Sequence, residues 1–324
     1  MIAADRPRRR RRALQALLVA VALAAVLLLG AFLVVVSLVG GELGGAGSLA
    51  GVDSGDTSIS WTPDGRHIIV ARDQEGATAL YELDSHGNDP RRLTSRDFDD
   101  EAPAVSPDGK RLAFIRFADA YEVDLYTAAA DGSNATALTH TEDQEGDPAW
   151  SPGGREIAFV RGYDLQMESD LYVMRADGTQ LRRLTHGSDL EEAPSWSPDG
   201  AWIAYKAYPG IYVMPAHGRG KRRLLTSGLA APAWSPDGKQ LAVVEDRAAI
   251  KVVSLATRKA RRLVVANAGT DFQTAPDDLA WSPDGRRLAY TVGGSLFTLD
   301  LATGASHRLT RCVDGGDADC GARS

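Results

Sequence analysis

Short apolar runs alternate with polar turns along most of the chain, and the same arrangement returns at a regular interval. Each run ends at an aromatic or apolar residue, a Ser/Thr-Pro-Asp/Gly-Gly turn follows, and a second apolar run begins after the turn. The six copies of this turn start 44, 45, 46, 38 and 47 residues apart, at residues 61–65, 105–109, 150–154, 196–200, 234–238 and 281–285. A period in the forties predicts a repeat architecture, in which each unit buries its apolar faces only against its neighbours.

Each repeat contains four predicted strands. The turn itself has a physical basis, because proline presets φ at the first corner, Asp accepts backbone hydrogen bonds and Gly takes a positive φ without steric cost. One strand precedes the turn, and the apolar run after it predicts a second strand that is buried on both faces, as at residues 112–115, 157–160 and 288–290. A third strand follows at residues 171–174, 211–214 and 296–299, and a fourth carries Arg-Leu-Thr at residues 92–94, 183–185 and 308–310. Four strands joined by hairpin turns predict the blade of an all-β propeller.

These motifs resemble the TolB-like β-propeller repeat, a WD-like repeat. The resemblance is carried by the Trp-Ser-Pro-Asp-Gly turn, the following Leu-Ala-Phe/Tyr and the Leu-Tyr-Val-Met strand, and it covers residues 56–311. It implies a six-bladed propeller of four-stranded antiparallel blades. It does not extend to the amino-terminal domain that accompanies the propeller in TolB, which has no counterpart before residue 56. The same repeat serves many proteins, so the resemblance implies a fold and not an activity.

Residues 56–311 hold six whole repeats, each running from the strand before the turn to the fourth strand. The last fourth strand ends near Thr310, so we expect the ring to close without a strand being exchanged between the first and last blades. Tryptophans precede the turn in five of the six repeats, as packing between blades demands, and we interpret them as structural: Trp61, Trp150, Trp196, Trp234 and Trp281.

The segment before the repeats has a different composition. Residues 1–12 hold six arginines and one acid, whereas residues 13–41 carry no charge and are mostly Ala, Leu and Val. At ~1.5 Å per residue this stretch is longer than a ~30 Å hydrocarbon core, and an arginine cluster stays on the cytoplasmic side. We therefore expect an uncleaved signal anchor at 13–41, a Gly-rich linker at 42–55, and a propeller outside the cytoplasm, for example in a periplasmic space. The alternative is a cleaved signal peptide.

The tail, residues 312–324, contains the only two cysteines of the chain, Cys312 and Cys320. A lone pair eight positions apart in an exported segment predicts a local disulfide. A metal site requires more thiol or imidazole ligands than this tail offers.

Familiar catalytic motifs are absent from the sequence. It contains no Gly-x-Ser-x-Gly elbow, no phosphate-binding loop, no His-Glu-x-x-His and no Cys-x-x-Cys. We therefore expect a non-catalytic module without a cofactor. One alternative is a propeller enzyme of the lyase or hydrolase kind, which could use a metal at His140 and His186, two histidines that follow Leu-Thr at matching positions of their repeats. A second alternative is an extracytoplasmic sensor.

The acids are concentrated in the loops between repeats. Those nearest the expected central channel precede the innermost strand, and we predict them to be exposed and to bind a partner: Asp100, Glu101, Glu145, Asp147, Glu191, Glu192, Asp277 and Asp278. Bases such as Arg183, Arg223 and Arg262 are expected on the opposite face. The chain carries −7, of which residues 1–12 contribute +5, so the remainder carries −12. This charge favours a protein or peptide that is basic at the contact and disfavours nucleic acid. The alternative is that these acids only keep the protein soluble.

The anchor leads to a prediction about the mature chain. Protein extracted from membranes should retain residues 13–41, because an apolar segment flanked by arginines stays in the bilayer. Intact-mass measurement tests this, and a mature chain that begins near Gly51 would contradict it.

The cysteines lead to a second prediction. Cys312 and Cys320 should be paired in protein taken from its native compartment, so thiol labelling under denaturing, non-reducing conditions should modify neither. Labelling of both residues without a reductant would remove the disulfide and weaken the case for export.

Overall fold

The computed structural model describes residues 56–310, apart from residues 75, 119–121, 163–167, 188, 220–222, 227–229, 247–248 and 265–277. The expected anchor at 13–41, the linker, Asp277 and both cysteines lie outside the described residues. In the part of the chain that is described, no helix is long and apolar enough to cross a membrane.

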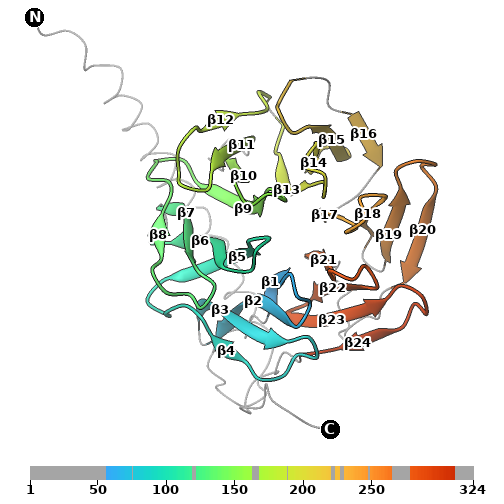
Figure 1. Cartoon of the computed structure of the whole chain (residues 1–324), viewed down its shortest axis with the longest axis horizontal. Helices are drawn as coiled ribbons and strands as arrows, with labels where there is room; N and C mark the ends of the chain where they lie inside the picture. The colour runs from blue at the N-terminus through green and yellow to red at the C-terminus, as the bar shows by residue number, and fades with distance from the viewer. Residues whose placement is uncertain are drawn as a thin grey trace, which may run out of the picture. The chain divides into compact units, whose positions relative to one another are not determined.

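Six four-stranded antiparallel sheets surround a central axis, which confirms the expected six-bladed propeller (Figure 1). Blade 1 contains β1 (Asp56–Trp61), β2 (His67–Gln74), β3 (Ala77–Asp84) and β4 (Arg91–Arg92); blade 2 contains β5 (Asp99–Val105), β6 (Arg111–Phe117), β7 (Val123–Ala129) and β8 (Thr136–Ala137). Blade 3 contains β9 (Glu145–Trp150), β10 (Glu156–Arg161), β11 (Asp170–Arg175) and β12 (Arg182–Arg183); blade 4 contains β13 (Glu192–Trp196), β14 (Trp202–Ala207), β15 (Gly210–Pro215) and β16 (Arg223–Thr226). Blade 5 contains β17 (Ala230–Trp234), β18 (Gln240–Asp246), β19 (Ala249–Ser254) and β20 (Ala260–Val264); blade 6 contains β21 (Leu279–Trp281), β22 (Arg287–Val292), β23 (Ser295–Asp300) and β24 (Ser306–Arg308).

The turn after each innermost strand forms as the sequence predicts. In blade 2 the Gly109 N–H donates to the Ser106 carbonyl at 2.8 Å, and Gly109 has a φ of 69°. The Ser106 hydroxyl donates to Asp108 Oδ1 at 2.7 Å, and this bond and the Lys110 N–H hold the pKa of Asp108 below its ordinary value. A Cβ at Gly109 would lie 3.6 Å from the Pro63 ring of the preceding blade, an ordinary contact distance, so the positive φ is what favours glycine here.

The outermost strands of blades 1 to 3 are only two residues long. The Arg-Leu-Thr segment of blade 1 is a strand only at β4, where it pairs with β3, because the next two residues leave the regular ladder. Leu93 is buried in the core, and the Thr94 hydroxyl accepts the Leu80 N–H at 3.0 Å in place of a backbone carbonyl. A side chain therefore completes the ladder where the strand ends.

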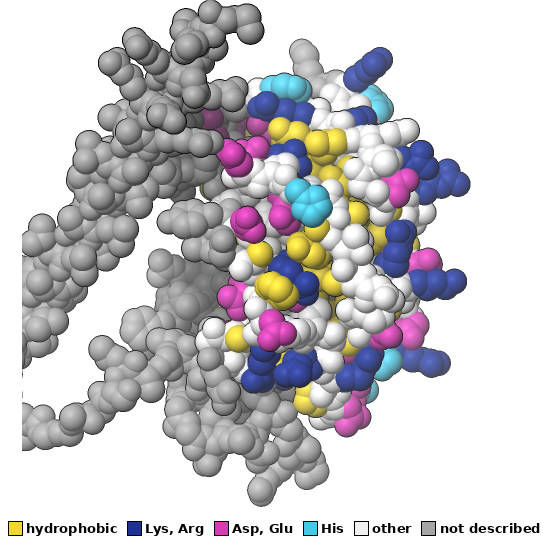
Figure 2. All heavy atoms as spheres, turned by 90° about the vertical axis from the view of Figure 1, so that its left-hand side faces the viewer, with side chains coloured by type: hydrophobic (Ala, Val, Ile, Leu, Met, Phe, Trp, Pro, Cys, Tyr) yellow, Lys and Arg dark blue, Asp and Glu magenta, His cyan; other side chains and the backbone are white. Residues whose placement is uncertain are grey.

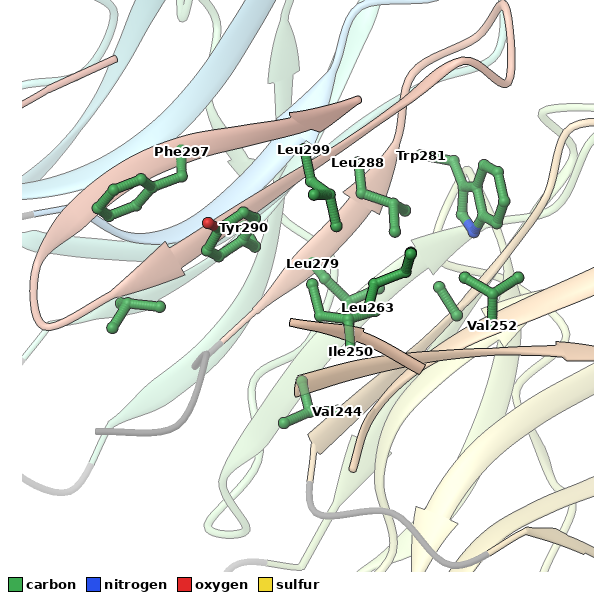
Figure 3. Close-up of a cluster of buried hydrophobic side chains, with 12 residues drawn as sticks. Val244, Ile250, Val252, Leu263, Leu279, Trp281, Leu288, Tyr290, Phe297 and Leu299 are labelled. Carbon is green, nitrogen blue, oxygen red and sulfur yellow. The ribbon is translucent and has the colours of Figure 1, made fainter. Parts of the chain in front are cut away.

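The hydrophobic core lies between blades. Figure 3 shows one such cluster, in which Val244 and Ile250 of blade 5 lie beside Leu279 and Leu288 of blade 6. Four of the turn tryptophans also bind the preceding blade through the indole N–H, as when Trp150 Nε1 donates to the Ala104 carbonyl at 3.1 Å; the equivalent bonds of Trp196, Trp234 and Trp281 are 3.2, 3.0 and 3.0 Å long.

The ring closes without strand exchange, as expected, because every sheet is built from four consecutive strands. Blades 6 and 1 are joined by apolar packing, in which Ala289 and Leu296 contact blade 1, and by hydrogen bonds. The Asp56 N–H donates to the Gly294 carbonyl at 3.0 Å, and the Thr291 hydroxyl donates to the Thr57 carbonyl, also at 3.0 Å.

Candidate functional site

A central channel of about 600 Å³ is lined by the innermost strands of all six blades. These strands are sheet edges, and four of them carry a proline, which has no N–H to offer to the open edge: Pro103, Pro148, Pro194 and Pro232. Beside three of the prolines the backbone takes a positive φ, at Ala102, Asp147 and Ala193, each close to 50°. The pairing register shifts along these strands, so each is bulged where it faces the channel.

Charged side chains in the channel wall are mostly acidic. Asp147, Glu192 and Asp278 line it together with one base, Lys206. The Lys206 ammonium lies 2.5 Å from Glu192 Oε2.

Two of these carboxylates are held by the backbone of the next blade. Asp147 Oδ2 accepts the Ala193 N–H at 2.8 Å, and Asp278 Oδ2 accepts the Ile59 N–H at 3.0 Å. In blade 1 the Ser58 hydroxyl takes the same role and accepts the Ala102 N–H at 3.0 Å. These bonds fix the carboxylates at the wall and join the innermost strands of neighbouring blades.

Two acids of the innermost strands, Asp147 in the channel wall and Glu101 in blade 2, have raised pKa values. Burial raises the pKa of Asp147 above its ordinary value, the nearby Glu192 carboxylate raises it further, and the Ala193 N–H and Lys206 act in the opposite direction. Glu101, on the innermost strand of blade 2, is half-buried, and its pKa is raised by burial and by the charges of Asp99 and Asp73. A positively charged group at the channel would favour the ionised form of these acids.

Three acids of the predicted set are buried, so the expectation that they are exposed is wrong. Asp100, Glu145 and Glu191 are at most 2 % exposed. Arg116 binds Asp100 through two nitrogens, at 2.7 and 2.8 Å, and Arg161 Nε lies 2.6 Å from Glu145 Oε1. A bidentate guanidinium of this kind compensates for burial of the carboxylate.

Sequence reasoning did not select Asp56, the equivalent acid of blade 1. It is 2 % exposed, and its two oxygens accept Arg72 Nε and Nη2 at 2.6 and 3.2 Å. A signal was present in the sequence, because in blades 1 to 3 an acid stands five residues before the end of the innermost strand and an arginine follows it sixteen positions later. The pairs are Asp56 with Arg72, Asp100 with Arg116, and Glu145 with Arg161.

Three of these buried acids also tie neighbouring blades together through a threonine. The threonine that follows the outermost strand of one blade donates its hydroxyl to the acid of the next: Thr139 to Glu145 Oε2 at 3.1 Å, Thr185 to Glu191 Oε2, and Thr310 to Asp56 Oδ2 at 2.6 Å. The same hydroxyls accept a backbone N–H of their own blade, from Leu125, Leu171 and Leu296. We call this unit the threonine bridge. The last of the three closes the ring.

Of the predicted residues that the structure describes, Asp147, Glu192 and Asp278 line the channel, whereas Glu101 and the two histidines do not. His140 and His186 are exposed, and within the described ranges no group of three or more His, Cys, Asp or Glu side chains is placed to hold a metal ion. Asp277 lies outside the described residues. Each of the expected acids that remains, Glu101, Asp147, Glu192 and Asp278, is partly buried rather than exposed.

The opposite face is mixed in charge. Figure 2 shows Lys and Arg side chains projecting from one edge of the propeller with Asp and Glu side chains among them. Two of the bases expected there are paired, Arg183 with Asp170 and Arg262 with Glu245. Five carboxylates also lie in the Pro-Asp-Gly turns: Asp64, Asp108, Asp199, Asp237 and Asp284. The pKa of each is lowered, because a Ser or Thr hydroxyl and a backbone N–H donate to it.

Six four-stranded blades around an open channel define the protein as a six-bladed β-propeller. The chain belongs to the TolB beta propeller domain family, PD40, whose profile matches residues 44–165 and 102–230, together more than half of the chain. No curated protein matches it.

Solved structures of several proteins share the fold. TolB from Acinetobacter baumannii is 20 % identical with a TM-score of 0.56, and the match covers 66 % of this chain and 55 % of that protein. A putative TolB from Agrobacterium tumefaciens is 22 % identical with a TM-score of 0.57, covering 71 % and 87 %. An oligogalacturonate lyase from Vibrio parahaemolyticus is 14 % identical with a TM-score of 0.54, covering 74 % and 75 %. At these identities the likeness concerns the fold alone.

The threonine bridge leads to a stability prediction. Thr139→Val should lower the free energy of unfolding by about 1–3 kcal/mol, because it leaves the buried Leu125 N–H and an oxygen of Glu145 without their shared hydroxyl. Denaturant titration measures the change. The matched control, Thr136→Val on the exposed strand β8 that precedes Thr139, should stay within about 0.5 kcal/mol of the parent. Equal effects of the two variants would show that the bridge does not stabilise the ring.

Proposed function

We propose that the protein is a non-catalytic binding module that takes a cationic segment of a protein or peptide at its central channel. The observation that supports this most directly is the set of three carboxylates in the channel wall, Asp147, Glu192 and Asp278, against the single base Lys206. Acids that line a cleft with low-dielectric walls concentrate the field there and aid the encounter with a positive partner.

The channel chemistry suits an ammonium group. The ammonium group of Lys206 already lies 2.5 Å from Glu192 Oε2, so the channel wall has room for an ammonium beside a carboxylate. Burial raises the pKa of Asp147 in the free protein, because the Ala193 N–H and Lys206 compensate its ionised form only in part. A lysine side chain or an amino terminus from a partner would supply the missing positive charge.

We propose further that the module works outside the cytoplasm, tethered by residues 13–41. The uncharged stretch and the arginines before it support this location. A short Gly-rich linker would hold the channel close to the membrane surface, where a membrane-bound or exported partner could reach it.

The channel proposal is tested with a fluorescent oligolysine peptide as the probe. The triple variant Asp147→Asn/Glu192→Gln/Asp278→Asn removes three channel charges and keeps side-chain oxygens that accept the backbone N–H groups. We expect it to weaken binding at low salt by about tenfold and to flatten the salt dependence, because the field at the channel is lost. Fluorescence anisotropy measures both effects.

The matched control removes three exposed acids away from the channel, Asp97→Asn/Glu142→Gln/Asp143→Asn, and leaves the same net charge. It should bind the probe nearly as the parent does. Lys206→Met should act in the opposite direction and tighten binding, because it releases Glu192. The proposal fails if the two triple variants bind alike, or if Lys206→Met weakens binding.

A further inference from the structure

A repeated slot lies between blades on the side of the Pro-Asp-Gly turns. At two blade boundaries the residue two positions after the turn glycine lies over the turn tryptophan of the next blade. Between blades 2 and 3 this residue is Arg111, whose guanidinium lies 4.5 Å from the centroid of the Trp150 ring and donates to the Gly154 carbonyl at 3.1 Å. Between blades 6 and 1 it is Arg287, 5.3 Å over Trp61. In these two slots the chain itself provides the guanidinium.

The slot between blades 4 and 5 is built differently. Its residue at the same position is Trp202, which is 38 % exposed. Trp234, the turn tryptophan of blade 5, is half-buried, whereas Trp61 and Trp150 in the arginine-filled slots are 7 % and 8 % exposed. A pocket of about 550 Å³ lies here, with Trp202 and Trp234 both in its wall.

The pocket has the surroundings that a guanidinium requires. Gly238, the counterpart of Gly154, lines it, so the carbonyl that accepts a guanidinium N–H in the sister slot has an equivalent. The turn carboxylates of Asp199 and Asp237 also line it, and both have a lowered pKa because the hydroxyls of Ser197 and Ser235 donate to them. Two negative charges therefore lie beside two indole faces.

Apolar side chains form the rest of the wall: Val213, Leu225 and Leu255. They can contact the methylene stem of a long side chain while its charged end lies on the indole. Arg258 is the one base in the lining, and its side chain is exposed. Its positive charge repels a cationic side chain that enters the pocket.

We propose that this pocket binds an arginine side chain of a partner polypeptide, stacked on Trp234 as Arg111 is stacked on Trp150. Arginine suits the site better than lysine, because its planar guanidinium stacks on an aromatic face and donates in a fixed fork. The pocket shares Trp234 and Pro198 with the lining of the channel but none of its acids, so the channel variants leave the carboxylates of this pocket in place.

The test uses the full chain with tryptophan-labelled NMR, in which the indole N–H signals report on each ring. The probe is Nα-acetyl-arginine amide. We expect saturable shifts of the Trp202 and Trp234 signals, with the Trp150 signal unmoved. The neutral isostere Nα-acetyl-citrulline amide should shift neither, and the acetyl-lysine amide should bind at least about threefold more weakly. Free arginine carries charged α-groups, so its binding distinguishes a site for the free amino acid from a site for a peptide. Tighter binding of free arginine than of the blocked form would overturn the peptide assignment.

Three variants complete the test. Trp202→Arg recreates the arrangement of the sister slots, so it should abolish probe binding. Gln240→Arg introduces arginine at the same position of blade 5 and should leave binding intact. Arg258→Ala should tighten binding by removing the competing charge.

Three outcomes would overturn the proposal. The first is the absence of saturable shifts in both the parent and Arg258→Ala. The second is equal binding of the citrulline probe. The third is loss of binding in Gln240→Arg as complete as in Trp202→Arg. Should Trp202→Arg fail to fold, Trp202→Ala replaces it, and unchanged probe affinity in that variant would also contradict the proposal.

Discussion

Contact between neighbouring blades is the constraint on which this structure depends, because a four-stranded sheet that is apolar on both faces has no stable existence alone. The middle strands are buried on both sides, so burial of apolar surface stabilises every boundary between blades. Polar groups follow the same rule. The threonine bridge uses one hydroxyl to complete the ladder of its own blade and to bind a carboxylate of the next. Separating two blades thus exposes apolar surface and breaks buried hydrogen bonds together.

Successive residues of an innermost strand point in opposite directions, and the acids of this protein divide accordingly. Glu191 is buried and bonded to Thr185, whereas the adjacent Glu192 lies in the channel wall beside Lys206. Asp100 and Glu101 divide in the same way, one in an ion pair with Arg116 and the other half-buried with a raised pKa. A single short acidic segment therefore serves both cohesion of the ring and the electrostatics of the channel.

This division explains what could be predicted from the sequence. The turn signature and the apolar runs have short-range causes, so the number of blades, the order of strands and the structural role of tryptophans such as Trp150 follow from reading along the chain. The environment of a carboxylate depends on groups distant in sequence. Glu145 is buried because Thr139 of the preceding blade and Arg161 of the next strand bind it, and the spacing of this acid and arginine gains its meaning only from the fold. The Trp202 pocket was missed for a similar reason, since it becomes visible only when equivalent positions of the six blades are compared in space.

The seam between blades 6 and 1 has a consequence for how such rings can change in evolution. No strand crosses it, and the indole nitrogen of Trp61 is buried there without a hydrogen-bond partner, unlike the four sister tryptophans that donate across their boundaries. A ring joined by contacts between whole blades can gain or lose one repeat by a single duplication or deletion in its gene, because no blade is assembled from two distant parts of the chain. The number of blades can then change during evolution while the structure of each sheet stays the same.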